Sequence, residues 1–273
     1  MAKVFASEYP RNDIGLILFP GDTYYRKELF PFWDRLGVSL SEHPAKANVF
    51  LVQSIVEYVS EPGETIMDIM AGTGTILVAA LIGRRVVCIE IESSYVGLLQ
   101  QGVLDIERAA PGAEEMITII EGDCSKILPL PVADHIIFSP PYAQIMRSKN
   151  ITSGLDKDTW GEGRGILKYS KHPDNIGNLN EFLYHQRMEI IYKKAFESLP
   201  PGGTLTIIIK DHMIKGKRVY IGNRAMRDCI RAGFEEVARF KWLPHGSVYT
   251  GVHKGAGWEV VEDEDIIILR RPR

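Results

Sequence analysis

The chain has 273 residues, of which 45% are hydrophobic and 25% are charged, so its composition is that of a globular protein with a sizeable buried core. The formal net charge of −3 excludes a chain that is basic throughout, as some nucleic-acid-binding proteins are. The three cysteines stand far apart without a Cys-x-x-Cys pair, which argues against a zinc site and against a disulfide scaffold.

The charged and apolar residues are unevenly distributed along the chain. Residues 143–220 carry 13 Lys and Arg against 8 Asp and Glu, which indicates either a polyanion-binding face or an ordinary solvated surface. No run reaches 18 apolar residues, and the first residues, MAKVFASEYPRND, contain no apolar leader segment. We therefore expect a soluble, cytoplasmic protein that contacts no membrane and binds no metal.

From residue 64 onward, short apolar runs alternate with longer helical patterns. This alternation is typical of parallel strands joined by right-handed crossovers, and it predicts a doubly wound α/β fold with a seven-stranded, mostly parallel sheet. In such a fold, ligands bind at the carboxyl ends of strands where the strand order reverses. Strands are predicted at 64–70, 85–91, 116–122, 134–139, 203–210, 235–243 and 264–271, and helices at 75–83, 93–109, 180–199 and 222–234.

Two segments do not follow this alternation. Residues 1–45 are rich in turn-forming residues and predict no clear element. Residues 143–179 form a long, polar, glycine-rich insertion, and connections of this length inside a compact domain are usually functional or disordered. We interpret the chain as a single domain, residues 1–273, that contains this insertion.

The turn between the first strand and the first helix reads DIMAGTGT, from Asp68 to Thr75. Gly72 and Gly74 allow a tight turn and a close approach of the backbone to a ligand, as a nucleotide site requires. The turn lacks the Lys-Ser/Thr ending of a P-loop, and Leu77 replaces the third glycine of the dinucleotide fingerprint. A Gly-x-Gly pair by itself is equally well explained as a tight turn.

Acidic residues stand at the ends of the next two strands. Glu90 or Glu92 follows the glycines by about 20 residues, where a carboxylate accepts hydrogen bonds from both hydroxyls of a ribose. Asp123 ends the third strand, where its carboxylate can accept a hydrogen bond from an adenine amino group. One acid at a strand end is simply a solvated residue, but acids after three successive strands favour an adenosine-type ligand.

The fourth strand ends in the residues FSPPY, from Phe138 to Tyr142. Two adjacent prolines lack N–H groups and fix φ, so they end the strand and make its exit rigid. At this point the chain resembles the Rossmann-like, class I methyltransferases that use S-adenosylmethionine to modify exocyclic amines in DNA. In that family, a D/N/S-P-P-Y/F string is the catalytic motif.

The resemblance extends over most of the chain. HPAKANVFLVQSIVEYV (43–59) is similar to the family's upstream cofactor motif, and MDIMAGTGT to its glycine motif, although D-P-F-x-G-S-G-T is more usual. GRRVVCIEIESSY, EGDCSKI and LPPGGTLTIIIKD are similar to the later motifs, and KHPDNIGNL (171–179) to an element of phage-type and solitary DNA methylases. The resemblance implies S-adenosylmethionine as cofactor, bound by Lys46, Asp68, Ala71, Gly72, Thr73, Gly74, Thr75, Glu90 and Asp123.

The resemblance also implies that Ser139, Pro140, Pro141 and Tyr142 are catalytic. The lone pair of an exocyclic amine is delocalised into its base, and acceptors such as the Ser139 hydroxyl and the Pro140 carbonyl free it. The target base must leave the duplex, and Tyr142 provides an aromatic surface on which it stacks. Carbon-5 cytosine methylation is disfavoured because that chemistry needs a cysteine nucleophile and the chain has no Pro-Cys pair.

Serine at the first motif position favours N4 of cytosine over N6 of adenine within this family. RNA is a less favoured partner than DNA, and glutamine amides of proteins are less favoured again. An inactive nucleic-acid-binding module is a different alternative, but the intact acids, glycines and Ser-Pro-Pro-Tyr string argue against it.

The resemblance includes no large separate recognition domain, so residues 143–179 become the candidate recognition insertion. Residues 243–258 are a second candidate, and monomer and homodimer are both open. For each single basic residue of the insertion, solvation is the better explanation than a phosphate contact, whereas Lys46 fits a surface lysine and a cofactor contact equally well. His212 and His245 are interpreted as ordinary loop histidines. The candidate nucleic-acid contacts are Lys149, Trp160, Arg164, Lys168 and Lys171.

Overall fold

All seven predicted strands are present in the computed structural model, which describes residues 3–31, 47–142, 172–214, 217–244, 255 and 259–273. Each strand begins and ends within two residues of its predicted bounds. The strands are β1 (Thr65–Asp68), β2 (Arg85–Glu90), β3 (Ile117–Glu121), β4 (His135–Phe138), β5 (Thr204–Ile209), β8 (Glu235–Trp242) and β9 (Glu264–Arg270).

These strands form one sheet in the order β3-β2-β1-β4-β5-β9-β8. Strands β1 to β5 pair in parallel, whereas β9 runs antiparallel to both β5 and β8. The chain builds outward from β1 to β3 and then returns to β4 on the other side of β1, so the strand order reverses between β1 and β4. Ligands of doubly wound sheets bind at the carboxyl ends of strands beside such a reversal.

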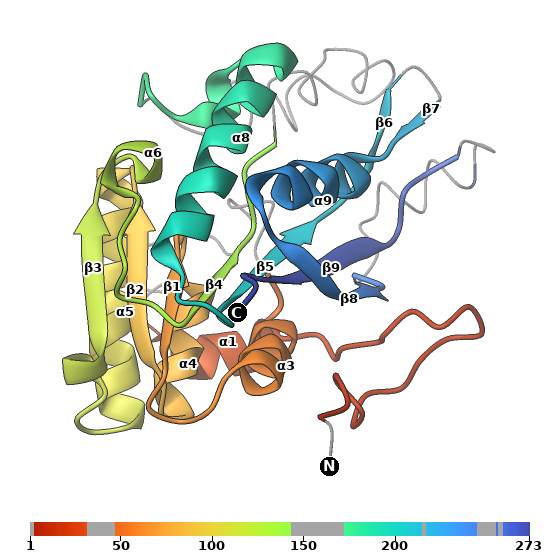
Figure 1. Cartoon of the computed structure of the whole chain (residues 1–273). Coiled ribbons are helices and arrows are strands. Elements are labelled where there is room, and N and C mark those ends of the chain that lie inside the picture. Colours follow the sequence, from red (N-terminus) through yellow and green to blue (C-terminus); the bar gives the residue numbers. More distant parts are fainter. Residues whose placement is uncertain (1–2, 32–46, 143–171, 215–216, 245–254, 256–258) are drawn as a thin grey trace, which may run out of the picture.

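Helices cover both faces of the sheet (Figure 1). The elements α1 (Thr23–Leu29), α3 (Val49–Val59), α4 (Val78–Leu81) and α5 (Ser93–Ala109) pack on one face, and α8 (Glu181–Ser198) and α9 (Ile221–Ala232) pack on the other. Shorter helical elements are η1 (Thr75–Leu77), η2 (Glu114–Met116), α6 (Cys124–Ile127) and η6 (Ile176–Asn178).

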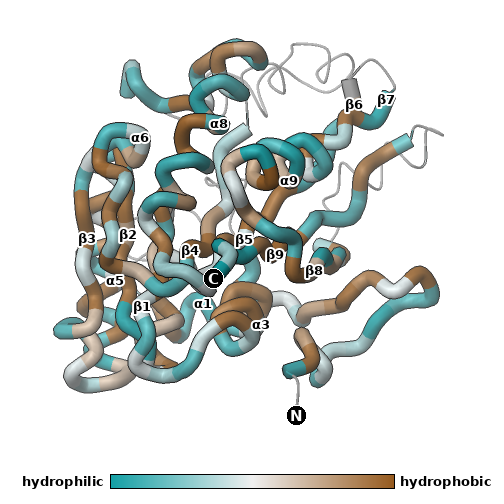
Figure 2. Tube along the Cα trace, viewed as in Figure 1, coloured by the Kyte–Doolittle hydropathy of each residue, from teal (hydrophilic) through white to brown (hydrophobic). Residues whose placement is uncertain are grey.

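Side-chain alternation along the strands divides the apolar residues into two cores. On β1, Ile66 packs into the core with α3, α4 and α5, while the next residue, Met67, packs into the core with α8 and α9. Figure 2 shows hydrophobic residues concentrated along α3 and along β9, which are buried in this way. The strands are therefore apolar on both faces, as a sheet covered by helices on two sides requires.

Two local features differ from the sequence prediction. The helix expected at 75–83 begins as the short η1 turn, which Gly74 precedes with φ of 82°, and continues as α4. The hairpin of β6 (His212–Ile214) and β7 (Lys217–Val219) was not predicted, since strands of three residues are too short to display a periodic pattern. Figure 1 shows this hairpin beside α9.

Candidate active site

A cavity opens at the carboxyl ends of β1 to β4, beside the reversal in strand order. Together with the open solvent that adjoins it, the cavity contains about 1090 Å³ of space. We call it the cofactor-side cavity. Its walls include predicted site residues from all four strand ends, namely Asp68, Ala71, Gly72, Thr73, Thr75, Glu90, Asp123, Ser139, Pro140 and Pro141.

Glu90 connects the end of β2 to the glycine turn. Its Oε2 accepts a hydrogen bond from the backbone N–H of Gly72 at 2.6 Å, and its Oε1 accepts one from the backbone N–H of Glu92 at 2.9 Å. Gly72 has φ of 52°, a left-handed conformation that brings its N–H to the carboxylate at low cost. Burial raises the pKa of Glu90, and the backbone hydrogen bonds oppose that rise.

Asp68, the last residue of β1, lies on the wall of the same cavity. Its Oδ1 accepts a hydrogen bond from the backbone N–H of Met70 at 3.0 Å. Desolvation raises the pKa of Asp68 to about 7; the Met70 hydrogen bond opposes this rise, and the charge of Glu90 adds a smaller contribution to it. The two carboxyl groups therefore repel each other when both are ionised, and a cationic or hydrogen-bond-donating ligand relieves that repulsion.

Asp123 forms the third acidic part of the wall. Its Oδ1 accepts a hydrogen bond from the backbone N–H of Ser125 at 2.8 Å and caps α6. Its Oδ2 is buried and has no hydrogen-bond partner among the described residues, although Lys126 and Arg187 place nitrogens 3.8 Å away. An unsatisfied acceptor on a cavity wall fits a ligand that brings a hydrogen-bond donor, such as an amino group.

Gly74 serves the packing of the turn and does not line the cavity. Its φ of 82° is left-handed, and a Cβ atom there would lie 2.5 Å from Cδ2 of Leu99 on α5. The glycine is therefore required for the approach of the turn to α5, whereas Gly72 is the glycine that faces the ligand space.

The Ser-Pro-Pro-Tyr segment leaves the sheet where β4 ends. Phe138 is buried, Pro140 is buried, and Ser139 and Pro141 are partly exposed on the wall of the cofactor-side cavity. Tyr142 does not line that cavity but lines a second one, formed with residues of α8, the β6–β7 hairpin and α9. The motif therefore stands between two cavities.

The end of the insertion packs against the cofactor-side cavity, and sequence reasoning did not anticipate this. Asp174, Asn175 and Ile176 line the cavity. Lys126 Nζ lies 2.6 Å from Oδ2 of Asp174, and Asn175 Nδ2 donates a hydrogen bond to Oε1 of Glu92 at 3.2 Å. The KHPDNIGNL string, noted as a family resemblance, was the sequence signal that pointed here, but nothing in it indicated which cavity it would reach.

Comparisons with known proteins agree with this geometry. A family model for N6/N4 methyltransferases, described as DNA methylase, matches residues 20–101. The match includes the glycine turn and Glu90 and ends before the Ser-Pro-Pro-Tyr segment. No curated protein shows significant sequence similarity to the chain.

Among solved structures, an S-adenosylmethionine-dependent methyltransferase from Methanosarcina mazei is similar to this chain, with 12% identity over 80% of this chain and 97% of that chain and a TM-score of 0.51. The glycopeptide N-methyltransferase MtfA matches with 13% identity over 82% of this chain and 90% of that one, with a TM-score of 0.48. TrmN from Thermus thermophilus matches with 16% identity over 82% of this chain, with a TM-score of 0.47, and this chain spans about half of its length, 49%.

The chain has the Rossmann-like fold of class I, S-adenosylmethionine-dependent methyltransferases, as predicted. The family model described as DNA methylase favours methyltransferase activity with S-adenosylmethionine as the cofactor, and it covers residues 20–101 only. No helix in the described part of the chain is long and apolar enough to cross a membrane.

Several predicted residues lie outside the described part of the chain. Lys46 is one of them, and so is most of the candidate recognition insertion. The predicted nucleic-acid contacts in that group are Lys149, Trp160, Arg164, Lys168 and Lys171.

Proposed function

We propose that the protein is a DNA methyltransferase that transfers a methyl group from S-adenosylmethionine to the exocyclic amine of a flipped-out base, with N4 of cytosine as the preferred target. The observation that carries this proposal is the convergence of Asp68, Glu90 and Asp123 with Ser139 and Pro140 on one cavity. The proposed reaction needs acids that bind adenosine and a motif that activates the amine. The residues proposed for these two roles line the same cavity.

The acidic residues of the cavity suit the adenosine part of the cofactor. In this proposal Glu90 accepts hydrogen bonds from the ribose hydroxyls, since both of its oxygens are held at the wall by backbone N–H groups. Asp123 accepts a hydrogen bond from the adenine amino group through its unsatisfied Oδ2. Gly72 and its neighbours leave room beside the turn, and Lys46 remains the proposed partner of the methionyl carboxylate.

Ser139 and Pro140 prepare the acceptor amine. When bound, the cofactor supplies an electrophilic methyl group on a positively charged sulfur, which keeps the electrons of the broken C–S bond. The Pro140 carbonyl and the Ser139 hydroxyl accept hydrogen bonds from the amine, which shifts its nitrogen toward sp³ geometry and frees the lone pair for the attack on the methyl carbon. Two prolines hold these acceptors still, so positioning is the main source of acceleration.

The product amine is cationic after the transfer and releases its proton to solvent, so the site needs no strong base. Serine fits this requirement because its hydroxyl is a hydrogen-bond acceptor without being a general base at neutral pH. We propose that Tyr142 stacks on the extruded base, which contributes about 1–3 kcal/mol in comparable complexes. Cytosine is preferred over adenine on the identity of Ser139.

The acceptor can be identified by incubating the protein with tritiated S-adenosylmethionine and, in separate reactions, genomic DNA from a methylation-deficient bacterial strain, total RNA, or protein extract. We expect label in DNA, and we expect nucleoside analysis to find it on N4 of cytosine. Label on N6 of adenine would keep the mechanism and change the target, whereas label confined to RNA or protein would contradict the proposal.

Tyr142→Ala provides the second part of this test. Loss of the stacking surface is expected to lower kcat/KM for DNA by about 10- to 100-fold while the dissociation constant of the cofactor changes less than twofold. Tyr24→Ala is a matched control, because Tyr24 is 85% exposed on α1 and lines neither cavity.

A further inference from the structure

The second cavity begins where the catalytic motif leaves the cofactor-side cavity. Ser139, Pro140 and Pro141 line the first cavity, and the next residue, Tyr142, lines the second. A transfer reaction needs a donor site and an acceptor site that meet at the catalytic groups. We propose that this second cavity binds the target base of DNA and that His212 determines specificity by hydrogen bonding to the edge of the base; this proposal rests on the proposed function.

The lining of this cavity suits a flat, uncharged ring. Three tyrosines face it, Tyr142 from the motif, Tyr184 from α8 and Tyr220 from the start of α9, together with Val219 and Ile221. A phosphate or carboxylate site would be lined chiefly by cations, but among the described lining residues Arg224 is accompanied by Glu181. Aromatic surfaces with few charges are the usual environment of an extruded base.

Within the part of the chain that the structure describes, His212 is a polar group on this cavity without an internal hydrogen-bond partner. Both of its ring nitrogens are buried, and neither has a hydrogen-bond partner among the described residues. Buried polar atoms in native proteins are nearly always paired, so an unpaired imidazole on a cavity wall indicates a partner that arrives with a ligand. Burial lowers the pKa of His212, although Glu181 and Asp211 oppose this, and burial thereby favours the neutral imidazole.

A neutral imidazole presents one N–H donor and one acceptor nitrogen. The atom next to the reacting amine is a ring nitrogen acceptor in both candidate bases, N3 in cytosine and N1 in adenine. In this arrangement His212 donates to that ring nitrogen while Ser139 and Pro140 accept from the amine. An imidazole that donates at this point favours cytosine and adenine over thymine and guanine, which carry an N–H at the corresponding position.

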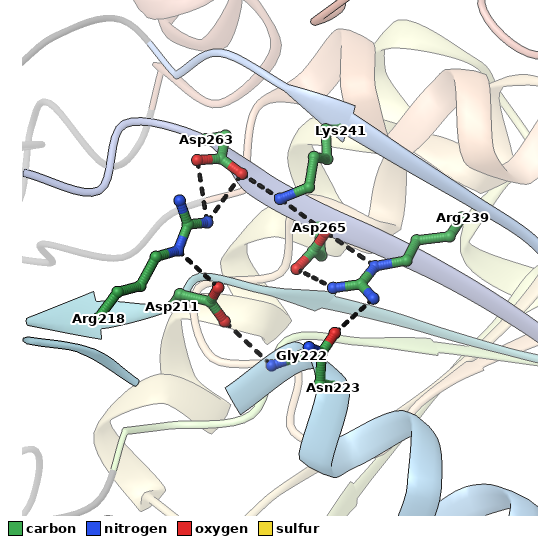
Figure 3. A network of polar contacts seen from close by, with 8 residues as sticks. All are labelled: Asp211, Arg218, Gly222, Asn223, Arg239, Lys241, Asp263 and Asp265. Atoms are coloured by element: carbon green, nitrogen blue, oxygen red, sulfur yellow. Dashed lines mark hydrogen bonds and ion pairs between the residues drawn. The ribbon is translucent and has the colours of Figure 1, made fainter. Parts of the chain in front are cut away.

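A polar network that begins at Asp211, the residue before His212, connects the elements around the second cavity (Figure 3). Asp211 accepts a hydrogen bond from Nε of Arg218 on β7 at 2.9 Å and one from the backbone N–H of Gly222 on α9 at 3.2 Å. One carboxylate therefore joins β6, β7 and α9, the three elements that supply His212, Val219 and Ile221 to the cavity.

The network continues into the main sheet. Arg218 donates to both carboxylate oxygens of Asp263, which also pairs with Lys241, and Arg239 pairs with Asp265 at 2.7 Å. Burial favours the neutral form of Asp263, but its hydrogen bonds with Lys241 and Arg218 outweigh this and lower its pKa to about 2. The hairpin is thus anchored to β8 and β9, so the position of His212 is set by the sheet.

The experiment compares wild type, His212→Ala and His212→Gln, with Tyr24→Ala as the exposed control. Two quantities are measured: kcat/KM for DNA from a methylation-deficient strain, and the cofactor dissociation constant by calorimetry. His212→Ala is expected to lower kcat/KM by about 10- to 100-fold, because the ring nitrogen of the base is left without a donor. The cofactor dissociation constant is expected to stay within twofold of wild type, and His212→Gln, which keeps a donor and an acceptor, is expected to recover most of the loss.

A structural role for His212 would weaken cofactor binding and lower the melting temperature in proportion to activity, and that result would overturn the proposal. Unchanged kcat/KM in His212→Ala would also overturn it. Should His212→Ala fail to fold, Val219→Trp carries the test, because it fills the same cavity from β7 and is expected to abolish transfer while cofactor binding persists. If Val219→Trp lost both methyl transfer and cofactor binding, the proposal would be overturned.

Once the methylated site has been mapped, a duplex with 3-deazacytosine at the target removes the acceptor from the base. For wild type, kcat/KM is expected to fall on this substrate by the same factor by which His212→Ala lowers it on cytosine. For His212→Ala, the change of substrate is expected to lower kcat/KM no further. If the two changes lowered kcat/KM additively, the proposed contact between His212 and the ring nitrogen would be contradicted. If wild type methylates no DNA at all, the proposed function fails; if it methylates DNA and the His212 variants are unaffected, that function stands and the assignment of the second cavity falls.

Discussion

The two cavities on either side of the Ser-Pro-Pro-Tyr segment are built in different ways. The cofactor-side cavity takes its acids and its glycine turn from the ends of consecutive strands, between Asp68 and Asp123. The second cavity takes Tyr142 from the motif, Tyr184 from α8, His212 from β6 and Arg224 from α9. One is assembled from neighbouring βα units, and the other from elements brought together by tertiary packing.

The electrostatic character of the two cavities differs as well. The cofactor-side cavity gathers carboxyl groups whose pKa values are raised by burial, as for Asp68 and Glu90. The second cavity has aromatic walls and the imidazole of His212, whose pKa is lowered by burial. The first suits a ligand with hydroxyls, amines and positive charge, and the second suits a neutral ring. Mutations should therefore separate cofactor affinity from acceptor turnover.

The largest effect is expected at the boundary between the cavities. Pro140→Ala releases the backbone that aims the carbonyl at the amine, and misplacement of about 1 Å costs on the order of 100-fold in rate. We expect kcat for DNA to fall by about that factor while the cofactor dissociation constant changes less than threefold, as measured by single-turnover kinetics and calorimetry. Equal losses in both quantities would mean that the motif is structural.

The next largest effect is expected on the cofactor side. Glu90→Gln replaces one carboxylate oxygen with a donor and removes a charge-assisted hydrogen bond, so the cofactor dissociation constant should rise by about 10- to 100-fold. Glu92→Gln is the matched control, because the Glu92 carboxylate accepts from Asn175 and should matter less to the ligand. A larger effect from Glu92→Gln would assign the ribose contact to Glu92.

Alanine substitutions at Gly74 and at Gly63 distinguish the effect of packing from that of backbone conformation on stability. Gly74→Ala combines a left-handed φ with a Cβ that would meet Leu99, and we expect it to lower the free energy of unfolding by about 2–3 kcal/mol. Gly63→Ala has φ of 91° but open space around its Cβ, so we expect a loss of about 1 kcal/mol. Urea denaturation measures both, and similar losses would show that the contact with α5 is unimportant.

A separate effect is expected in the pH dependence of stability. The pKa of Asp68 is raised to about 7 in the folded protein from 3.8, so between these values the folded state holds a proton that the unfolded state has released. Stability from this group is complete below pH 4 and is lost as pH rises through about 7.

Asp68→Asn removes the titrating group and with it the loss of stability at high pH. The variant is therefore expected to melt a few degrees above the wild type at pH 8 and at nearly the same temperature at pH 4, measured by scanning calorimetry without cofactor. A stabilisation that is equal at the two pH values would contradict the raised pKa.

The sequence revealed the fold because the strands of a sheet covered on both faces are continuous apolar runs. The run DHIIF, for example, needs no tertiary context to be interpreted as β4. It also revealed the acids and the Ser-Pro-Pro-Tyr segment, since parallel strands place their carboxyl ends at one edge. Each of these features is local in the sequence, so a pattern of a few residues was sufficient to identify it.

The second cavity could not be predicted from the sequence, because its lining residues come from elements that only tertiary packing brings together. His212 is the first residue of β6, a strand of three residues that displays no periodic pattern. Its proposed role depends on the cavity that it lines together with Tyr184 and Tyr220, which come from other elements. The sequence interpretation as an ordinary loop histidine had no access to that packing, nor to the missing hydrogen-bond partners. The placement of Asp174 and Asn175 against the cofactor-side cavity depended on tertiary contacts in the same way.

In the proposed reaction, the Ser-Pro-Pro-Tyr segment between the two cavities prepares an exocyclic amine of DNA for methylation. The most direct test is to express wild type and Pro140→Ala in a methylation-deficient host and to analyse the nucleosides of its DNA by mass spectrometry. We predict N4-methylcytosine in DNA from cells with wild type and little or none in DNA from cells with Pro140→Ala. The absence of any N-methylated base from cells that contain folded wild-type protein would contradict the account.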